Sequence, residues 1–321
     1  MIDDTLPCYV PPDPSLWQGR TDSLPNERFF QHVQCIDMRY SSLESSKTSV
    51  LLGLASDEGI RRNQGRTGAQ LGPNHLRTQL GKLACHTAQN FLDIGNIHCT
   101  DDDLETAQDA FASLVSHCHA LGHKTIALGG GHEIAWGHFL GLAPHHAKLG
   151  IINFDAHFDL RPVYNDLGST SGTPFWQIKT YADQQQRSFE YCCLGIQSVA
   201  NTQSLFQQAN AWHVPFLMAE QIHHTQQEHH IDFLNQFIQN QDAIYLTICL
   251  DVFSESVAPG VSAPQPNGLM PWQVLPLLKY IVQTGKVVGM DIAELSPPLD
   301  QEEKTSRLAA VILAELLNLK D

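Results

Sequence analysis

The sequence predicts an α/β fold of three layers, α/β/α, around a mostly parallel sheet of eight strands. Short apolar runs of strand length alternate along the chain with longer amphipathic stretches. That alternation is typical of a parallel sheet whose two faces are covered by helices. No change of composition divides the 321 residues, so we expect one large domain, 48–321, preceded by an N-terminal arm, 1–47, that is rich in proline and polar residues.

The individual strands and helices follow from the same pattern. Strands are expected at the apolar runs 50–55, 91–94, 125–128, 149–154, 191–196, 214–217, 244–250 and 287–292. Helices are expected from Gly72-Pro73 onward and at about 101–121, 134–142, 229–240, 271–283 and 301–319. The arm is expected to be irregular apart from one short helix, and the polar segment 57–66 is expected to be a loop.

Composition argues against several classes of protein. The net charge of -15 disfavours nucleic acid or an anionic membrane as a partner. The acidic start of the chain and the lack of a long apolar run predict neither a signal peptide nor a membrane span. The eight cysteines lack the Cys-x-x-Cys spacing of zinc sites, and we interpret them as buried thiols of a cytoplasmic protein.

The most informative stretch is Asn153-Phe154-Asp155-Ala156-His157-Phe158-Asp159, at the end of the apolar run 149–154. Alternation along an extended chain puts Asp155, His157 and Asp159 on one face. Salt bridges would have to neutralise the two carboxylates, yet the nearest basic residue is Arg161. Because unpaired charges at a buried strand end are costly, we expect a bound cation. Mixed carboxylate and imidazole donors suit Mn²⁺ or Zn²⁺, and the oxygen majority favours manganese.

Three other expected strands also end in polar or glycine-rich residues. These ends are Gly129-Gly130-Gly131-His132-Glu133, Cys249-Leu250-Asp251 and Asp291-Ile292-Ala293-Glu294. In parallel sheets, ligands bind beyond the carboxyl ends of the strands, so these segments are expected to meet at one site. The glycine triplet does not fit a phosphate loop, and His132 considered alone would more often be a packed core histidine.

Taken in order, these motifs resemble the arginase and agmatinase (ureohydrolase) superfamily over residues 48–319. The segments 58–66, 171–175 and 258–264, together with Trp17-Gln18-Gly19-Arg20, are similar to the formimidoylglutamase branch of that superfamily. The resemblance implies an arginase-like fold and a centre of two Mn²⁺ ions. It further implies hydrolysis of N-formimidoyl-L-glutamate to L-glutamate and formamide in histidine degradation.

The resemblance also implies which residues hold the two metal ions. The first ion would take His132, Asp155 and Asp159. The second would take His157 and Asp251, with Asp155 bridging the two ions.

The superfamily's last metal motif has two aspartates at i and i+2, and this chain departs from it. Asp251 aligns either with the first aspartate, leaving Phe253 as the second, or with the second, leaving Cys249 as the first. The interval from Asp251 to Pro259 favours Cys249. A thiol offers one soft atom that manganese does not prefer. Cys249 is therefore expected at the site as a sulfur ligand or a neutral neighbour, with an inert strand cysteine as the alternative, and two-metal binding would be weakened but not abolished.

The remaining site residues are candidates for chemistry and for substrate binding. The resemblance implies that Glu294 faces the amidine group, because a carboxylate pairs with a planar cation. Asp159 or a water is expected to pass a proton to the departing amino group, and Asp291 is expected to support its strand end. The planar guanidinium groups of arginine suit the two carboxylates of formimidoylglutamate. At least one of the arginines in segment 58–66 is nevertheless expected to lie at the surface or to dock a helix, without contacting substrate. Substrate contacts are expected from Arg61, Arg62, Arg66, Ser171, Gly172, Gln197 and Asn201.

Two other functions stay open. An agmatinase-like or other guanidino-compound hydrolase would release urea, but those branches carry a histidine where this chain has Ser171. A metal-poor binding or regulatory protein would follow if Cys249 marks the loss of a working metal pair. The partners expected are a small amidine substrate and, as relatives allow, further copies of the chain. The pairs His223-His224 and His229-His230 lie in a polar stretch, and we interpret them as a solvated helix face.

Overall fold

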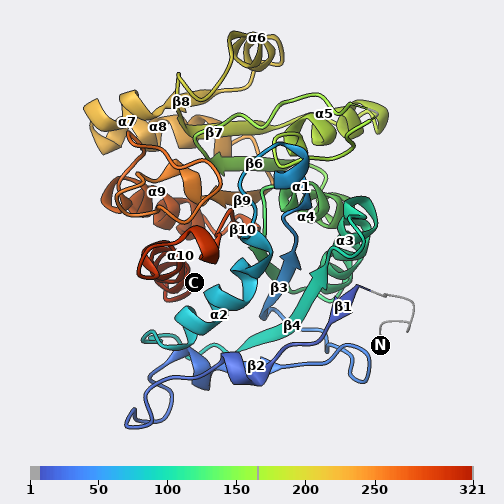
Figure 1. Cartoon of the computed structure of the whole chain (residues 1–321), viewed down its shortest axis with the longest axis vertical. Helices are drawn as coiled ribbons and strands as arrows, with labels where there is room; N and C mark the ends of the chain where they lie inside the picture. The colour runs from blue at the N-terminus through green and yellow to red at the C-terminus, as the bar shows by residue number, and fades with distance from the viewer. Residues whose placement is uncertain (1–7, 165, 320–321) are drawn as a thin grey trace.

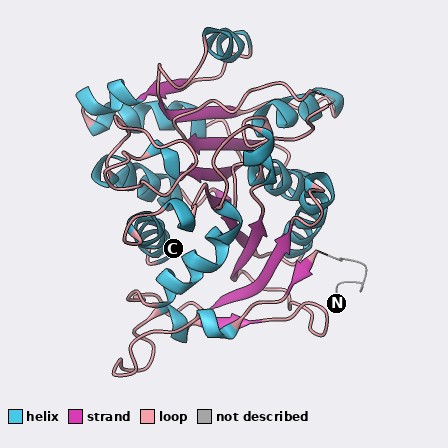
Figure 2. Ribbon diagram, viewed as in Figure 1, coloured by secondary structure: helices cyan, strands magenta, loops and turns pink. Residues whose placement is uncertain are grey.

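The computed structural model describes residues 8–164 and 166–319 and confirms the predicted fold class. Helices lie on both sides of a single sheet (Figures 1 and 2). The sheet has ten strands in the order β1-β4-β3-β5-β10-β9-β6-β7-β8, and β2 also pairs with β4. Among the strands of the described ranges, every pairing is parallel except that of β1 with β4.

All of the strands expected from the apolar runs are present. They are β3 (Ser49–Ala55), β4 (Phe91–His98), β5 (Lys124–Gly129), β6 (Leu149–Phe154), β7 (Tyr191–Ile196), β8 (Phe216–Met218), β9 (Ala243–Cys249) and β10 (Val287–Ala293). The expected count of eight strands was nevertheless too low, because β1 (Tyr9–Val10) and β2 (Val33–Cys35) come from the segment expected to be irregular. β2 pairs with residues 91–93 and β1 with residues 96–97. The two short strands therefore share the outer edge of β4.

Two layers of helices cover the sheet, and an apolar cluster lies under each layer. Along β3, Val50 and Leu52 belong to one cluster and Leu51 to the other, as the alternation of a buried strand requires. The first face is covered by α3 (Leu104–Ala120), α4 (Ile134–Leu142), α5 (Pro174–Gln184) and α6 (Gln203–Ala211). The second is covered by α2 (Gly72–Gly81), α7 (Ala219–His224), α8 (Gln227–Ile238), α9 (Pro271–Gln283) and α10 (Lys304–Leu317).

Three of the helices were not expected from the sequence. α5 and α6 fall where no element was expected, whereas α7 contains His223-His224, which were expected on a helix. The expectation of a loop over 57–66 was wrong for α1 (Glu58–Arg62), where Glu58 pairs with Arg61 and Arg62 at the i+3 and i+4 spacings of a helix. Within the described parts of the chain, no helix is long and apolar enough to cross a membrane.

A buried ion pair fastens the N-terminal segment to the sheet. Arg77 of α2 and Asp93 of β4 are both buried, and Arg77 Nε and Nη2 each lie 2.9 Å from an Asp93 carboxylate oxygen. The indole Nε1 of Trp17 donates to the same carboxylate at 2.8 Å. Further Arg77 N–H groups donate to Asn96 Oδ1 and to the carbonyl oxygen of Gly95. Trp17 is thus part of a structural network at the edge of the sheet.

A group of histidines lies near the amino end of β5, where the strand begins. His119, near the end of α3, contacts Thr125 Oγ1 at 3.1 Å. Its ring centroid lies 5.9 Å from that of His145 and 5.6 Å from that of His146. Burial, reinforced by the neighbouring histidines, lowers the pKa of His119 from 6.5 to about 3.

This depressed pKa predicts a loss of stability in acid. Folding favours neutral His119, so its contribution is fully present above pH 6.5 and is lost as the pH falls toward 3. We expect His119→Gln to reduce the acid-induced loss of unfolding free energy by up to about 1.4 kcal/mol per pH unit. Urea unfolding of both proteins at several pH values between 6.5 and 3 measures the difference. Identical pH slopes would contradict the prediction.

Candidate metal and active site

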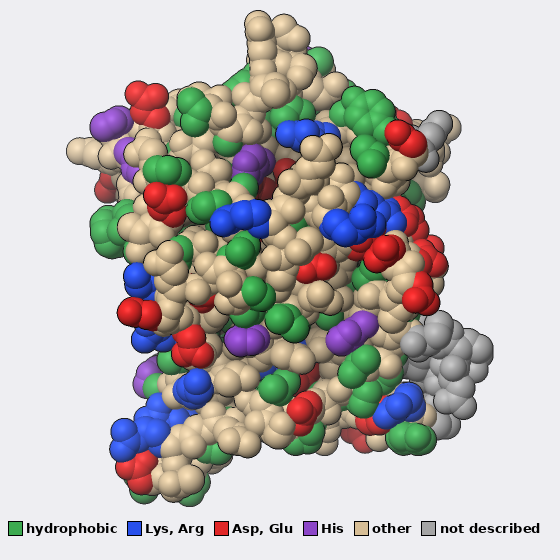
Figure 3. Space-filling model, viewed as in Figure 1, with side chains coloured by type: hydrophobic (Ala, Val, Ile, Leu, Met, Phe, Trp, Pro, Cys, Tyr) green, Lys and Arg blue, Asp and Glu red, His purple; other side chains and the backbone are tan. Residues whose placement is uncertain are grey.

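A cavity of about 340 Å³ lies at the carboxyl ends of β5, β6, β9 and β10. On the face of the molecule shown in Figure 3, a histidine and acidic side chains are visible between Lys or Arg side chains. The strand ends expected to meet at one site do so here. Of the expected site residues, those that line the cavity are Arg66, His132, His157, Asp159, Ser171, Asn201, Cys249, Asp251 and Glu294.

Five imidazole and carboxylate side chains form a compact cluster at the floor of this cavity. His132 Nδ1 lies 2.9 Å from Asp155 Oδ2 and 2.9 Å from Asp159 Oδ2. His157 Nδ1 lies 3.0 Å from Asp251 Oδ2 and 3.4 Å from Asp155 Oδ1. Asp155 therefore touches both histidines and is the centre of the cluster. The structure brings together all five residues that the sequence proposed as oxygen and nitrogen ligands.

Cys249 is the last residue of β9, and its side chain also reaches the cluster. The sulfur, a ring nitrogen of His132 and a carboxylate oxygen of Asp155 lie within 4.8 Å of one another. Burial, with the nearby charges of Asp155 and Asp251, raises the pKa of the Cys249 thiol well above its usual value. Phe253, the alternative partner of Asp251 in the motif, is instead buried in an apolar cluster.

The buried acids of the cavity repel one another electrostatically. Burial and the neighbouring Asp155 raise the pKa of Asp159 to about 6, and the same two causes raise the pKa of Asp251. Burial also acts on Asp155, but hydrogen bonds with His132 and His157 hold its pKa below the usual value. A divalent cation would relieve this repulsion, and a donor set of carboxylate oxygens and imidazole nitrogens suits manganese. The residues present therefore fit the expected metal.

Glu294 follows β10 and stands at the wall of the same cavity. It adopts a left-handed backbone conformation with φ of 73°, and its amide N–H donates to the Gly130 carbonyl at 2.8 Å. Its Oε1 accepts the amide N–H of His132 at 3.0 Å, while its buried Oε2 has no hydrogen-bond partner within the described part of the chain. Such a conformation in a non-glycine residue is costly and is found mostly at functional sites. One carboxylate oxygen is thus free to accept a ligand's hydrogen bond.

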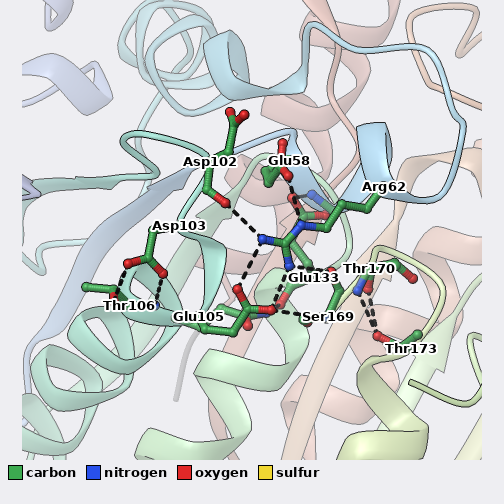
Figure 4. Close-up of polar contacts among 12 residues, drawn as sticks. Glu58, Arg62, Asp102, Asp103, Glu105, Thr106, Glu133, Ser169, Thr170 and Thr173 are labelled. Atoms are coloured by element: carbon green, nitrogen blue, oxygen red, sulfur yellow. Dashed lines mark hydrogen bonds and ion pairs between the residues drawn. The ribbon is translucent and has the colours of Figure 1, made fainter. Parts of the chain in front are cut away.

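Two of the expected substrate arginines have their charges satisfied by the protein itself. Arg62 joins three segments, because it donates to Glu58, to Glu105 and to the carbonyl oxygen of Ser169 (Figure 4). Arg61 makes a two-pronged pair with Glu58, at 2.6 Å for both contacts. Neither residue is part of the cavity lining.

Two other arginines do line the cavity, and they differ in how their guanidinium groups are used. Arg66 donates through Nε and Nη2 to the carbonyl oxygens of Ser262 and Val261. The Arg161 guanidinium has no hydrogen bond or ion pair with any residue of the described ranges, and only its backbone N–H is bonded, to the Gly172 carbonyl. From the sequence, Arg161 was considered only as a salt-bridge partner. Its position two residues after Asp159 was the signal for a place at the site.

Comparison with known proteins identifies the family. The arginase family model matches residues 47–318. A formimidoylglutamase of Legionella pneumophila (strain Paris) is 55% identical over 318 residues, 99% of each chain. A formimidoylglutamase of Geobacillus sp. (strain WCH70) is 39% identical over 319 residues, 96% of each chain. The chain belongs to the arginase family.

Solved structures agree with this arginase-family membership. The crystal structure of formimidoylglutamase from Bacillus subtilis has a TM-score of 0.82 at 25% identity, covering 93% of this chain and 94% of its own. The crystal structure of Trypanosoma cruzi formiminoglutamase with Mn²⁺ shares the fold, with a TM-score of 0.79 at 22% identity. The match covers 91% of this chain and 97% of the chain in that structure. The predicted superfamily and enzyme class, a hydrolase of C–N bonds in linear amidines, are therefore confirmed.

The remaining substrate candidates have different places in this arginase-family structure. Ser171 Oγ accepts a hydrogen bond from Asn63 Nδ2 at the cavity rim. Gly172 lies behind Arg161, where an added Cβ would come 3.0 Å from Arg161 Cδ. Asn201 lines the cavity, but its amide group contacts the backbone of residues 156, 158 and 197. Gln197 points away to the Asn267 carbonyl and does not line the cavity.

Proposed function

We propose that this arginase-family protein is a manganese-dependent cytoplasmic enzyme that hydrolyses N-formimidoyl-L-glutamate to L-glutamate and formamide in histidine degradation. The names of the full-length relatives support this substrate. The observation that carries the proposal is one cavity with three features: a cluster of imidazoles and carboxylates, a Glu294 carboxylate oxygen and an Arg161 guanidinium, the last two without a partner among the described residues. Those three features match the three parts of the substrate: the reacting carbon, the amidine and the carboxylates.

The ligand assignment follows the two halves of the cluster. His132, Asp155 and Asp159 would hold one ion, and His157 and Asp251 would hold the other, with Asp155 between them. Bound Mn²⁺ supplies a water of lowered pKa as the nucleophile. Cys249 lies beside the first group and would add at most a soft ligand.

The protein's own residues orient the substrate and move a proton. Glu294 Oε2 accepts an amidinium N–H, which fixes the plane of the formimidoyl group beside the cluster. Asp159 is the proposed group that passes a proton to the departing amino group, because its carboxylate lines the cavity beside the cluster. Arg161 is the proposed partner of a substrate carboxylate, since it retains a complete fork of donors.

The role of Arg161 predicts a defect in substrate binding. Arg161→Met removes a charge-assisted contact worth about 1.5–3 kcal/mol, which corresponds to a roughly 10- to 150-fold rise in KM. A smaller change is expected in kcat, because the carboxylate is remote from the reacting carbon. Steady-state kinetics of Arg161→Met beside Arg61→Met, whose guanidinium is held by Glu58, separates substrate recognition from loss of surface charge. Equal KM values in the two variants would contradict this role.

The position of Cys249 predicts a gain in metal binding from one substitution. Cys249→Asp replaces a soft atom with hard carboxylate oxygens beside His132 and Asp155, so we expect Mn²⁺ to bind more tightly. Titration of the metal-free protein with Mn²⁺, followed by electron paramagnetic resonance, measures the affinity. Cys249→Ser controls for loss of the thiol alone, and an affinity of Cys249→Asp no higher than that of Cys249→Ser would refute the prediction.

A direct assay tests the proposed function. Purified protein, stripped of metal and then assayed with and without added Mn²⁺, should release formamide and glutamate from formimidoylglutamate only when Mn²⁺ is present. Agmatine and guanidinobutyrate serve as competing substrates. Preferential urea release would replace the proposal with a guanidino-compound hydrolase, and a failure to retain stoichiometric Mn²⁺ would favour a binding or regulatory protein.

A further inference from the structure

A line of buried polar side chains runs from the cavity into the core, beginning at His132. His132 Nε2, the ring nitrogen that faces away from Asp155 and Asp159, lies 2.9 Å from Thr247 Oγ1. Tyr245 is two residues from Thr247 on the same face of β9, and its hydroxyl donates to Asp291 Oδ2. Thr247, Tyr245 and Asp291 have no solvent exposure. The line therefore extends from the ring of His132 to a carboxylate that does not line the cavity.

The sheet places these residues by simple alternation and register. Tyr245, Thr247 and Cys249 are at alternate positions of β9 and share the face under α4. Asp291 lies opposite Thr247 in the neighbouring strand β10. The hydroxyl groups of β9 and the carboxylate of β10 thus form a line that ends at the strand end where the metal cluster lies.

The carboxylate fixes the direction at the inner end of this line, because Asp291 Oδ2 accepts from the Tyr245 hydroxyl and from His138 Nδ1 at 2.7 Å. At the other end, His132 Nδ1 lies 2.9 Å from a carboxylate oxygen of both Asp155 and Asp159 and donates to them. To hold a cation through Nδ1, the ring must instead carry its proton on Nε2. Thr247 Oγ1, 2.9 Å from Nε2, is placed to accept that proton.

We propose that Thr247, Tyr245 and Asp291 are positioning residues that fix the tautomer and the ring orientation of His132 and so set the manganese affinity of the site. The inference rests on the proposed function, because it takes His132 as a metal ligand. Metal-binding histidines generally donate their second N–H to such a partner, and loss of the partner lowers metal affinity roughly 10- to 100-fold. In this chain the carboxylate acts through two hydroxyl groups.

The test compares variants at the two ends of the buried chain. Thr247→Val removes the acceptor for His132, and Tyr245→Phe breaks the link to Asp291 while keeping the ring. Thr247→Ser keeps the hydroxyl and should rescue the site. Thr180→Val is the control for loss of a hydroxyl, because the Thr180 hydroxyl donates to the Trp176 carbonyl within α5 and contacts neither the cluster nor Asp291 among the described residues.

Mn²⁺ titration of the metal-free protein decides the outcome. Binding should be roughly 10- to 100-fold weaker for Thr247→Val and weaker for Tyr245→Phe. Thr247→Ser and Thr180→Val should keep the wild-type affinity.

Contrary results separate this inference from the proposed function. Wild-type Mn²⁺ affinity in Thr247→Val, or an equal loss in Thr180→Val, would overturn the positioning role and leave the function intact. A wild-type protein that binds no Mn²⁺ would overturn the proposed function together with this inference. If Thr247→Val does not fold, Tyr245→Phe against Thr180→Val gives the same decision.

Discussion

Glu294→Gln is expected to lose most of its hydrolytic activity and to keep its manganese. The substitution preserves the shape of the side chain and removes the negative charge opposite the amidinium. Loss of one partner in a buried charged pair costs about 2–5 kcal/mol, which corresponds to a roughly 30- to 5,000-fold fall in kcat/KM. Because Glu294 is outside the proposed ligand set, the Mn²⁺ content should match that of the wild type.

Kinetics on formimidoylglutamate, together with metal analysis of the same samples, measure both parts of this expectation. Glu315→Gln is the matched control, because Glu315 of α10 pairs with Lys279 of α9 in a helical layer and does not line the cavity. Turnover of Glu294→Gln within twofold of the control would remove Glu294 from the reaction. Loss of manganese along with activity would instead assign Glu294 to the metal centre.

Arg77→Met is expected to be the most destabilising single change outside the active site. Among the described residues, it leaves the fully buried Asp93 carboxylate with only the Trp17 indole and the Gly95 backbone amide as donors. Breaking a buried ion pair by removing one partner typically costs about 3–5 kcal/mol, because an uncompensated charge stays buried. The free energy of unfolding from urea titration measures the loss.

A double variant tests the stated cause of this loss. Arg77→Met with Asp93→Leu removes both charges, so we expect it to recover part of the stability lost by Arg77→Met alone. Trp17→Phe removes only one neutral donor and should cost about 1 kcal/mol. A double variant less stable than Arg77→Met would show that packing, and not the unpaired charge, dominates the network.

The sequence predicted the central sheet well because each central strand is a continuous apolar run buried on both faces. β1 and β2 have two and three residues, too few for a periodic signal, and they form because β4 offers unpaired backbone groups. α1 depends on ion pairs with Glu58 inside a polar segment that reads as a loop. In these cases tertiary contacts decide the local structure, and a single sequence does not display them.

The candidate site shows the same division. The histidine and carboxylate cluster was predictable, because its members stand at strand ends in a recognisable order. The separate roles of Arg62 and Arg161 were not, because they depend on whether Glu105, from a distant helix, lies within reach. Thr247 and Tyr245 read as ordinary strand residues, and only the register of β9 against β10 brings them into line with Asp291.

The short strands at the edge of β4 have a consequence for the behaviour of the whole molecule in solution. An open sheet margin offers its backbone N–H and C=O groups to any other chain, which is a common route to self-association. Here residues 91–93 and 96–97 of β4 already bond to β2 and β1 of the same chain. The N-terminal segment thereby protects this edge of the sheet from pairing with strands of other molecules, a role that is independent of catalysis.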